Sequence, residues 1–121
     1  DAGLVYNTFP YMGDGIIPIE YGNLGFIDPF ENPVTAQFHH RLLASITLII
    51  IIIYSILYII RNPINLRILL LLFAIVCQFI IGIFTLLYSV PITLGAMHQF
   101  VGVLLFLSAL WVLHSPKKNT F

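Results

Sequence analysis

The sequence predicts an all-α integral membrane protein with three transmembrane helices, which form most of a four-helix bundle. Hydrophobic residues make up 60% of its 121 residues and charged residues only 8%, whereas a soluble domain carries about 25% charged residues. Three apolar runs follow residue 35, and each supplies about 20 residues, enough to cross a bilayer core of about 30 Å. Backbone groups in lipid must be paired internally, which favours helices for all three runs.

Residues 1–35 are expected to form an extramembrane segment on the outer side of the membrane. This stretch contains all five acidic residues of the chain, together with the turn signals Gly13-Asp14-Gly15, Asp28-Pro29 and Asn32-Pro33. It also holds too many large apolar residues for a free linker. We therefore expect the segment to lie against the membrane interface or to cap the helices.

The membrane part, residues 36–118, is expected to contain three helices, at about 36–60, 66–88 and 92–114. Each apolar run ends at a group that contains a proline: Arg61-Asn62-Pro63, Ser89-Val90-Pro91 and Ser115-Pro116. Proline lacks the backbone N–H that a helix interior needs, so it typically follows a helix end. The three helices are therefore joined by short connections.

The basic residues predict how the chain is oriented. Arg61 and Arg67 flank the first connection, and Lys117 and Lys118 follow the last helix. Three crossings place both groups on one side, which the positive-inside rule assigns to the cytoplasm or matrix. The N-terminal segment then faces the periplasm or intermembrane space, in a bacterial plasma membrane or a mitochondrial inner membrane. Arg41 is the one basic residue on the outer side.

Two histidines are predicted to lie at the same depth near the outer surface. His40 is a few residues inside the first helix and His98 a few residues inside the third, and both helices run from outside to inside. Ionisable side chains at such positions are functional candidates, and two imidazoles on neighbouring helices suit the axial positions of a heme iron. The alternative is that each histidine bonds a carbonyl or water at the interface. His39 lies about 100° round the helix from His40, so both cannot face one iron.

Other polar and small residues have open alternatives. Arg41 is expected either to pair with a heme propionate, because guanidinium suits carboxylate, or to cap the membrane interface. The second helix carries a stripe of small and polar residues that is expected to face inward, either for a ligand or for ordinary helix packing. The stripe consists of Gln78, Gly82, Thr85 and Ser89.

The composition excludes several classes of protein. Five basic residues balance five acidic ones, which gives no basis for nucleic-acid binding. The sequence shows no serine–histidine–acid arrangement, no glycine-rich phosphate loop and no thiolate or carboxylate company for a zinc site. The single cysteine, Cys77, cannot form an intrachain disulfide.

Three groups of residues, taken together, carry a family resemblance. They are Asp1–Pro10 with Met12, Gly13 and Pro18; Glu31-Asn32-Pro33 with Gln37-Phe38-His39-His40-Arg41; and Val90-Pro91 with Leu94-Gly95-Ala96 and His98-Gln99. In order, they resemble the loop after the fifth transmembrane helix of heme A synthases, the entry to the sixth helix and the start of the eighth. The resemblance covers nearly the whole chain.

This resemblance implies a fold, a reaction and a set of ligands. Heme A synthases have eight helices in two similar halves and oxidise heme O to heme A for cytochrome oxidase. Their C-terminal half binds heme b between two histidines, which by position are His40 and His98 in this sequence. Arg41 and Gln99 belong to the same two motifs and are the further candidates for cofactor binding.

Only the sixth to eighth helices and the preceding loop are represented in this resemblance. We therefore expect either a longer protein or a partner polypeptide, carrying the N-terminal half, to complete the bundle, and we do not expect catalysis from this part alone. Two other functions stay open. One is a structural or assembly subunit of a respiratory complex, and the other is a small b-type electron carrier.

Overall fold

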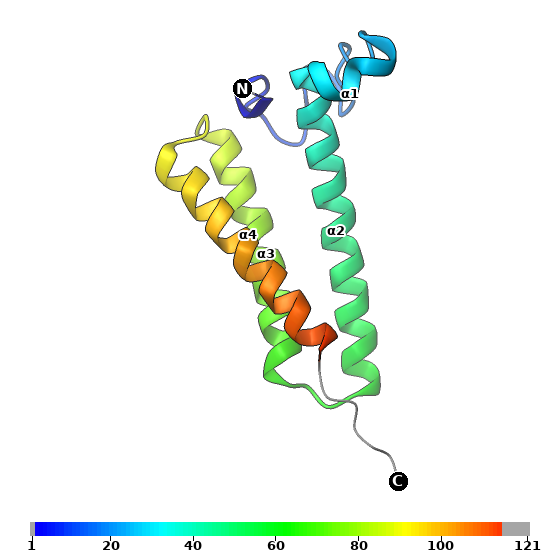
Figure 1. The fold of residues 1–121 in the computed structure, drawn as a ribbon, viewed down its shortest axis with the longest axis vertical. Coiled ribbons are helices and arrows are strands. Elements are labelled where there is room, and N and C mark those ends of the chain that lie inside the picture. Colours follow the sequence, from blue (N-terminus) through cyan, green and yellow to red (C-terminus); the bar gives the residue numbers. More distant parts are fainter. Residues whose placement is uncertain (1, 115–121) are drawn as a thin grey trace.

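Three long helices dominate the computed structural model, which describes residues 2–114 (Figure 1). In chain order the helices are η1 (Ala2–Leu4), η2 (Gly25–Ile27), α1 (Asp28–Glu31), α2 (Pro33–Arg61), α3 (Leu66–Leu87) and α4 (Ile92–Leu113). Within the described residues the long helices are α2, α3 and α4, and each is long and apolar enough to cross a membrane. The predicted class, an all-α integral membrane protein with three transmembrane helices, is therefore confirmed.

The first long helix begins at residue 33, three residues before the predicted start of the first span. Asn32 precedes it, and its side-chain oxygen accepts a hydrogen bond from the backbone N–H of Val34 at 3.1 Å. Pro33 occupies the first helical turn, where its missing N–H costs no hydrogen bond. An N-cap and a proline together specify this helix start. Asn65 caps α3 in the same way, through the N–H of Ile68 at 3.2 Å.

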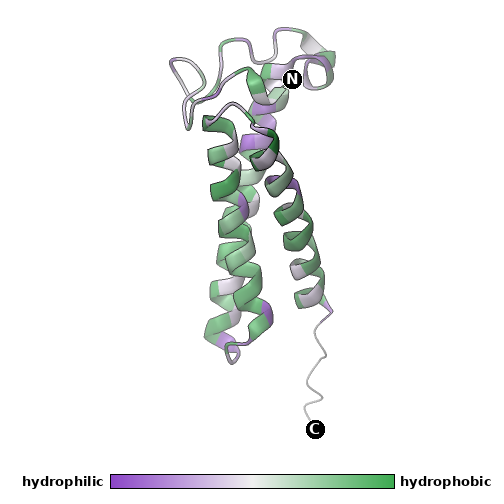
Figure 2. Cartoon of the chain, turned by 90° about the vertical axis from the view of Figure 1, so that its left-hand side faces the viewer, coloured by the Kyte–Doolittle hydropathy of each residue, from purple (hydrophilic) through white to green (hydrophobic). Residues whose placement is uncertain are grey.

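The helices pack unevenly. α3 and α4 run antiparallel in close contact, α2 contacts α3 less extensively, and α2 stands apart from α4 (Figure 1). The buried side chains of α3 include Ile68, Leu71 and Ile75, whereas α4 has none buried among the described residues. The bundle is therefore open between α2 and α4. Hydrophobic residues predominate along all three long helices (Figure 2), and many of their large apolar side chains are exposed.

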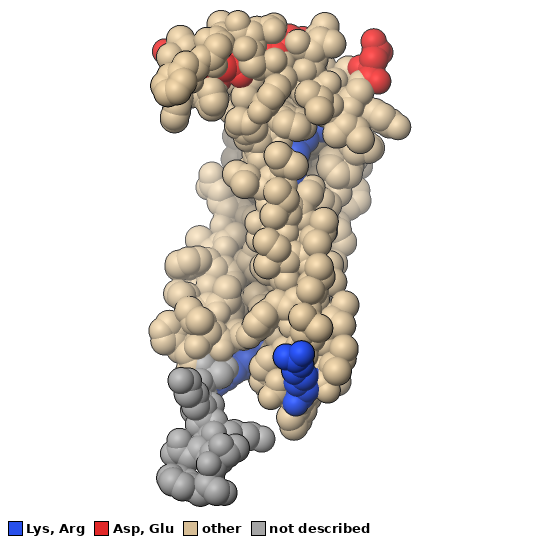
Figure 3. All heavy atoms as spheres, turned by 90° about the vertical axis from the view of Figure 1, so that its right-hand side faces the viewer, with Lys and Arg blue, Asp and Glu red and all other residues tan. Residues whose placement is uncertain are grey.

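The charged residues separate along the helix axis. Acidic residues lie in the N-terminal segment at one end, and the arginines that flank the α2–α3 connection lie at the other, while Arg41 lies near the acidic end (Figure 3). Arg67 places its guanidinium 5.1 Å from the ring centre of Trp111, which links α3 to α4 at the basic end. Lys117 and Lys118, part of the predicted orientation signal, lie outside the described residues.

A buried carboxylate organises the part of the N-terminal segment that precedes α2. Asp28 is only 1% exposed and accepts hydrogen bonds from the backbone N–H groups of Gly22 at 3.0 Å and Leu24 at 2.9 Å. The side chains of Asn32 and Thr35 also donate to it. Burial raises the pKa of Asp28, but these hydrogen bonds, with Thr35 foremost, outweigh burial and lower the pKa to about 2. The loop is thereby fixed to the start of α2.

Candidate functional site

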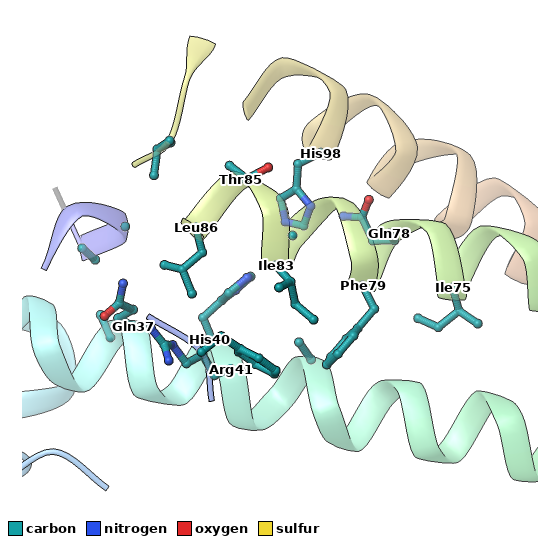
Figure 4. A pocket seen from close by; sticks show the side chains of 17 residues that line it. Gln37, His40, Arg41, Ile75, Gln78, Phe79, Ile83, Thr85, Leu86 and His98 are labelled. Carbon is teal, nitrogen blue, oxygen red and sulfur yellow. The ribbon is translucent and has the colours of Figure 1, made fainter. Parts of the chain in front are cut away.

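A cavity of about 480 Å³ lies between α2 and the α3–α4 pair, at the end of the bundle that carries the N-terminal segment (Figure 4). Its volume is in the range of small-molecule and cofactor sites, about 300–1,000 Å³. All three long helices line it, and Ala2, Gly3 and Phe9 of the N-terminal segment contribute to its wall. The cavity follows from the uneven packing, because α2 contacts α3 but leaves space towards α4.

His40 and His98 enter this cavity from opposite walls (Figure 4). His40 lies on α2 and is exposed, whereas His98 lies on α4 and is half-buried. Their ring centres are 6.3 Å apart, with the rings inclined at 78°. A metal–imidazole nitrogen bond is about 2 Å long, so two imidazoles on opposite sides of one metal ion have ring centres roughly 6 Å apart. The spacing therefore suits a single metal ion held between the two rings.

His98 lies directly on the backbone of α3. A Cβ atom added to Gly82 would be 2.9 Å from Cε1 of His98, closer than real side chains approach. Nδ1 of the ring is buried, and no group among residues 2–114 makes a hydrogen bond of good geometry to it. Buried polar atoms are nearly always paired. This nitrogen therefore needs a hydrogen-bond partner that the present geometry does not fully provide.

The other histidines lie away from the cavity. Nε2 of His39 is 2.9 Å from the hydroxyl of Tyr21, and the two rings meet edge to face. His114 lies at the opposite end of the bundle, where its Nδ1 is 2.9 Å from the carbonyl of Leu110. Neither ring lines the cavity, which leaves His40 and His98 as the pair within it.

Arg41 and Gln99 occupy different surroundings. Arg41 lines the cavity, and its guanidinium donates to the backbone carbonyls of Tyr6 at 2.9 Å and Pro10 at 3.4 Å. Its Nε is buried without a partner among the described residues. Gln99 is exposed on α4 and does not line the cavity, although it is next to His98 in the sequence.

Two residues that sequence reasoning missed hold the N-terminal segment across the mouth of the cavity. The buried side chain of Gln37 accepts from the N–H of Tyr6 at 3.2 Å and donates to its carbonyl at 2.9 Å. Asn7 donates to the carbonyl of Leu86 near the end of α3, at 3.0 Å. The segment therefore bridges α2 and α3. In the sequence, Gln37 stood out only as part of the Gln37–Arg41 motif. Its polar amide at a helix entry was the one feature that could have predicted a hydrogen bond to a distant part of the chain.

The predicted stripe on the second helix divides between the cavity and the turn that follows. Gln78, Gly82 and Thr85 line the cavity, together with Ala44 of α2. Ser89 instead lies in the turn after α3, with a positive φ of 59°. The three residues of the stripe that lie within α3 therefore line the cavity, and the one beyond the end of α3 does not.

The fold and the site define an integral membrane protein with a histidine pair facing across a cavity near one end of the helix bundle. The chain matches the cytochrome oxidase assembly protein family over residues 1–110, and it belongs to that family. No solved structure matches it.

Its curated relatives include proteins named heme A synthase. The chain is 43% identical to the one from Rickettsia bellii (strain OSU 85-389), over 99% of this chain and 36% of that protein. It is 41% identical to the one from Wolbachia sp. subsp. Brugia malayi (strain TRS), over 98% of this chain and 35% of the relative. For Wolbachia pipientis wMel the identity is 36%, with 99% and 34% covered. The predicted resemblance is confirmed, and the chain spans about a third of the length of these relatives.

Proposed function

We propose that this chain is the part of a heme A synthase that binds heme b, with His40 and His98 as the two residues that would hold its iron. The observation that carries the proposal is the 6.3 Å separation of the two ring centres across a cavity. Membership of the cytochrome oxidase assembly family supports it, as do relatives that are named heme A synthase.

The residues of the cavity fit such a group. Its donor set is two imidazoles, which are common axial ligands of heme iron. Both rings line the cavity, and that of His98 is half-buried there. The cavity wall is mainly apolar, with Phe9, Ile75 and Phe79 among its residues, and a wall of this kind suits the body of a porphyrin. When bound, the heme would supply one-electron redox chemistry at its iron.

The chain's own residues bind and shield the group. His40 and His98 would supply one nitrogen each from opposite walls. Arg41 would place positive charge at the cavity mouth, where a propionate has a partner, while its bonds to Tyr6 and Pro10 hold the N-terminal segment. That segment would limit the access of water to the cavity. Gln99 is left out of this assignment because it does not line the cavity.

The reaction and its setting belong to the same proposal. We propose that the bound heme b serves the oxidation of heme O to heme A, and that the rest of the bundle comes from another part of a longer protein or from a partner chain. The opening between α2 and α4 would receive it. The acidic N-terminal segment would face the periplasm or intermembrane space, and Arg61 and Arg67 the cytoplasm or matrix.

The test is a reduced-minus-oxidised spectrum of the chain purified from its native membrane with whatever accompanies it. We expect a low-spin b-type heme that disappears in His40→Ala and in His98→Ala. The matched control is His39→Ala, which changes a neighbouring imidazole outside the cavity and should keep the spectrum. A wild-type preparation without heme, or equal spectra in all three variants, would refute the assignment.

A further inference from the structure

Two polar side chains and two glycines interlock between α3 and α4. Gly82 lies under the ring of His98, where an added Cβ would meet Cε1 at 2.9 Å. Gly102 lies under the amide of Gln78, where an added Cβ would meet Nε2 at 3.0 Å. Residues 78 and 82 are one helical turn apart, and so are residues 98 and 102. Each helix thus offers one glycine to the polar side chain of the other.

The two contacts differ in what could give way. The amide of Gln78 ends a flexible side chain, so a small rotation would make room for a methyl group at position 102. The ring of His98 is rigid and cannot fold aside as an amide can, and its other side borders the cavity, so it can give way only by moving as a whole. A methyl group at position 82 would therefore displace the whole ring. Only glycine at this position lets the imidazole lie on the α3 backbone.

The ring turns its Cε1 edge towards Gly82, which places Nδ1 slightly closer to α3 than Nε2. The position of an added Cβ on Gly82 is 3.5 Å from Nδ1 and 3.8 Å from Nε2, and Nδ1 is the buried, unpaired atom. The backbone carbonyl of Gln78 faces His98 from the preceding turn of α3. A histidine that binds a metal commonly donates its other N–H to a carbonyl, which fixes the tautomer and the direction of the ring.

We propose that Gly82 is a positioning residue for His98: it admits the imidazole to the α3 backbone, so that Nδ1–H is directed at the Gln78 carbonyl and Nε2 is left for the cavity. The inference rests on the proposed function for the role of Nε2. The placement of Nδ1 on α3, however, is a property of the chain itself and can be tested without heme.

The first experiment measures the tautomer of His98 by ¹⁵N NMR on the heme-free chain in detergent micelles. We expect the wild type to carry its proton on Nδ1 and Gly82→Ala to give a mixture of both tautomers. Gln78→Leu should match the wild type, because the backbone carbonyl remains. A wild-type ring protonated on Nε2 would overturn the inference without any variant. So would a tautomer that changes in Gln78→Leu but not in Gly82→Ala.

The second experiment uses the heme-loaded protein and compares three glycine-to-alanine variants. We expect Gly82→Ala to weaken heme retention by about 10-fold or more, the range seen when support of a metal-binding histidine is lost, and to shift the heme reduction potential. Gly95→Ala is the matched control, since an added Cβ there is 3.9 Å from its nearest neighbour, Val90. Gly102→Ala tests the contact with the flexible Gln78 amide, which we expect to rotate away from the added methyl group.

Gly95→Ala should stay within about twofold of the wild type, because alanine favours the helix wherever space allows it. Gly102→Ala should do the same because the amide of Gln78 can rotate away from the added methyl group. Equal losses in all three variants would indicate general helix packing and overturn the positioning role. If the wild type binds no heme at all, the proposed function fails, and the NMR result alone decides the fate of this inference.

Discussion

The two walls of the cavity are built in different ways. The α3–α4 wall is a close contact between antiparallel helices in which glycines admit polar side chains. The α2 wall has little contact with α4 and is held at the cavity mouth by hydrogen bonds from Gln37 and Arg41 to the N-terminal segment. One wall is therefore fixed by steric fit, and the other by hydrogen bonds to the N-terminal segment. We call this segment, with its bonds to Gln37 and Arg41 of α2 and from Asn7 to α3, the polar strap. His98 belongs to the first wall and His40 to the second.

This difference gives the two imidazoles unequal freedom. His98 is half-buried on the α3 backbone, whereas His40 is exposed to the cavity. The position of His40 depends on where α2 stands, and α2 is tied near its far end as well, through a 2.7 Å hydrogen bond between Asn65 and the hydroxyl of Tyr58. Under the proposed assignment, His98 would be held in place before a group binds, whereas His40 would have more room to adjust its ring.

The largest expected effect comes from deleting each ring and supplying free imidazole. His98→Gly and His40→Gly should both lose the low-spin heme spectrum, because one axial ligand is gone. Added imidazole should restore the His40→Gly spectrum at the lower concentration, since that site opens to the cavity and the His98 site lies against α3. A titration followed by absorbance checks this. Rescue of His98→Gly at the same or a lower concentration would contradict the asymmetry.

The next effect tests the polar strap. Gln37→Leu removes both hydrogen bonds to Tyr6 and leaves its backbone N–H unpaired, at a cost of about 1–3 kcal/mol, while the Tyr6 carbonyl keeps its bond from Arg41. We expect proteases added from the outer side to cut within residues 2–24 at least several-fold faster. Gln99→Leu makes the same chemical change at an exposed position outside the cavity and should leave the cutting rate unchanged. Equal rates in the two variants would show that the strap is held by other contacts.

A smaller effect is expected where the strap reaches α3. Asn7→Ala removes the bond to the Leu86 carbonyl and a local one to the Gly3 carbonyl, but leaves the Gln37 and Arg41 bonds in place, so the loss should be about 1–2 kcal/mol. The same protease assay should show an intermediate rate. Asn23→Ala, at an exposed position of the same segment, is the control. A rate above that of Gln37→Leu would place the main anchor of the strap on α3 instead.

The sequence predicted more of the helices than of the contacts between them. Apolar length and the proline groups located three spans, and motif spacing placed His40 and His98 at one depth, since these signals are local along the chain. The start of α2 lies three residues before the approximate start predicted for the first span, because Asn32, one of the turn signals, also caps the helix. The hydrogen bonds of the polar strap and the contact between His98 and Gly82 join residues that are far apart in the sequence, so local patterns could not predict them. A glycine or an amide in one chain gives no indication of which partner it will meet.

The smallest effect at neutral pH concerns Asp28, which fixes the loop before α2. Its pKa of about 2 in the folded protein lies below the ordinary value of 3.8, so the carboxylate stabilises the loop fully above about pH 4. That contribution is lost as the pH falls from about 4 towards 2, because protons then bind the unfolded loop more readily than the folded one.

Cleavage by pepsin, which works in this range, should therefore speed up between pH 4 and 2 in the wild type. Asp28→Asn should be cut faster at pH 4 and show a flatter dependence, whereas Asp14→Asn, at an exposed position, should follow the wild type. If the rate of cleavage of Asp28→Asn rises as steeply with falling pH as that of the wild type, another carboxylate controls the loop. The polar strap would then not depend on Asp28.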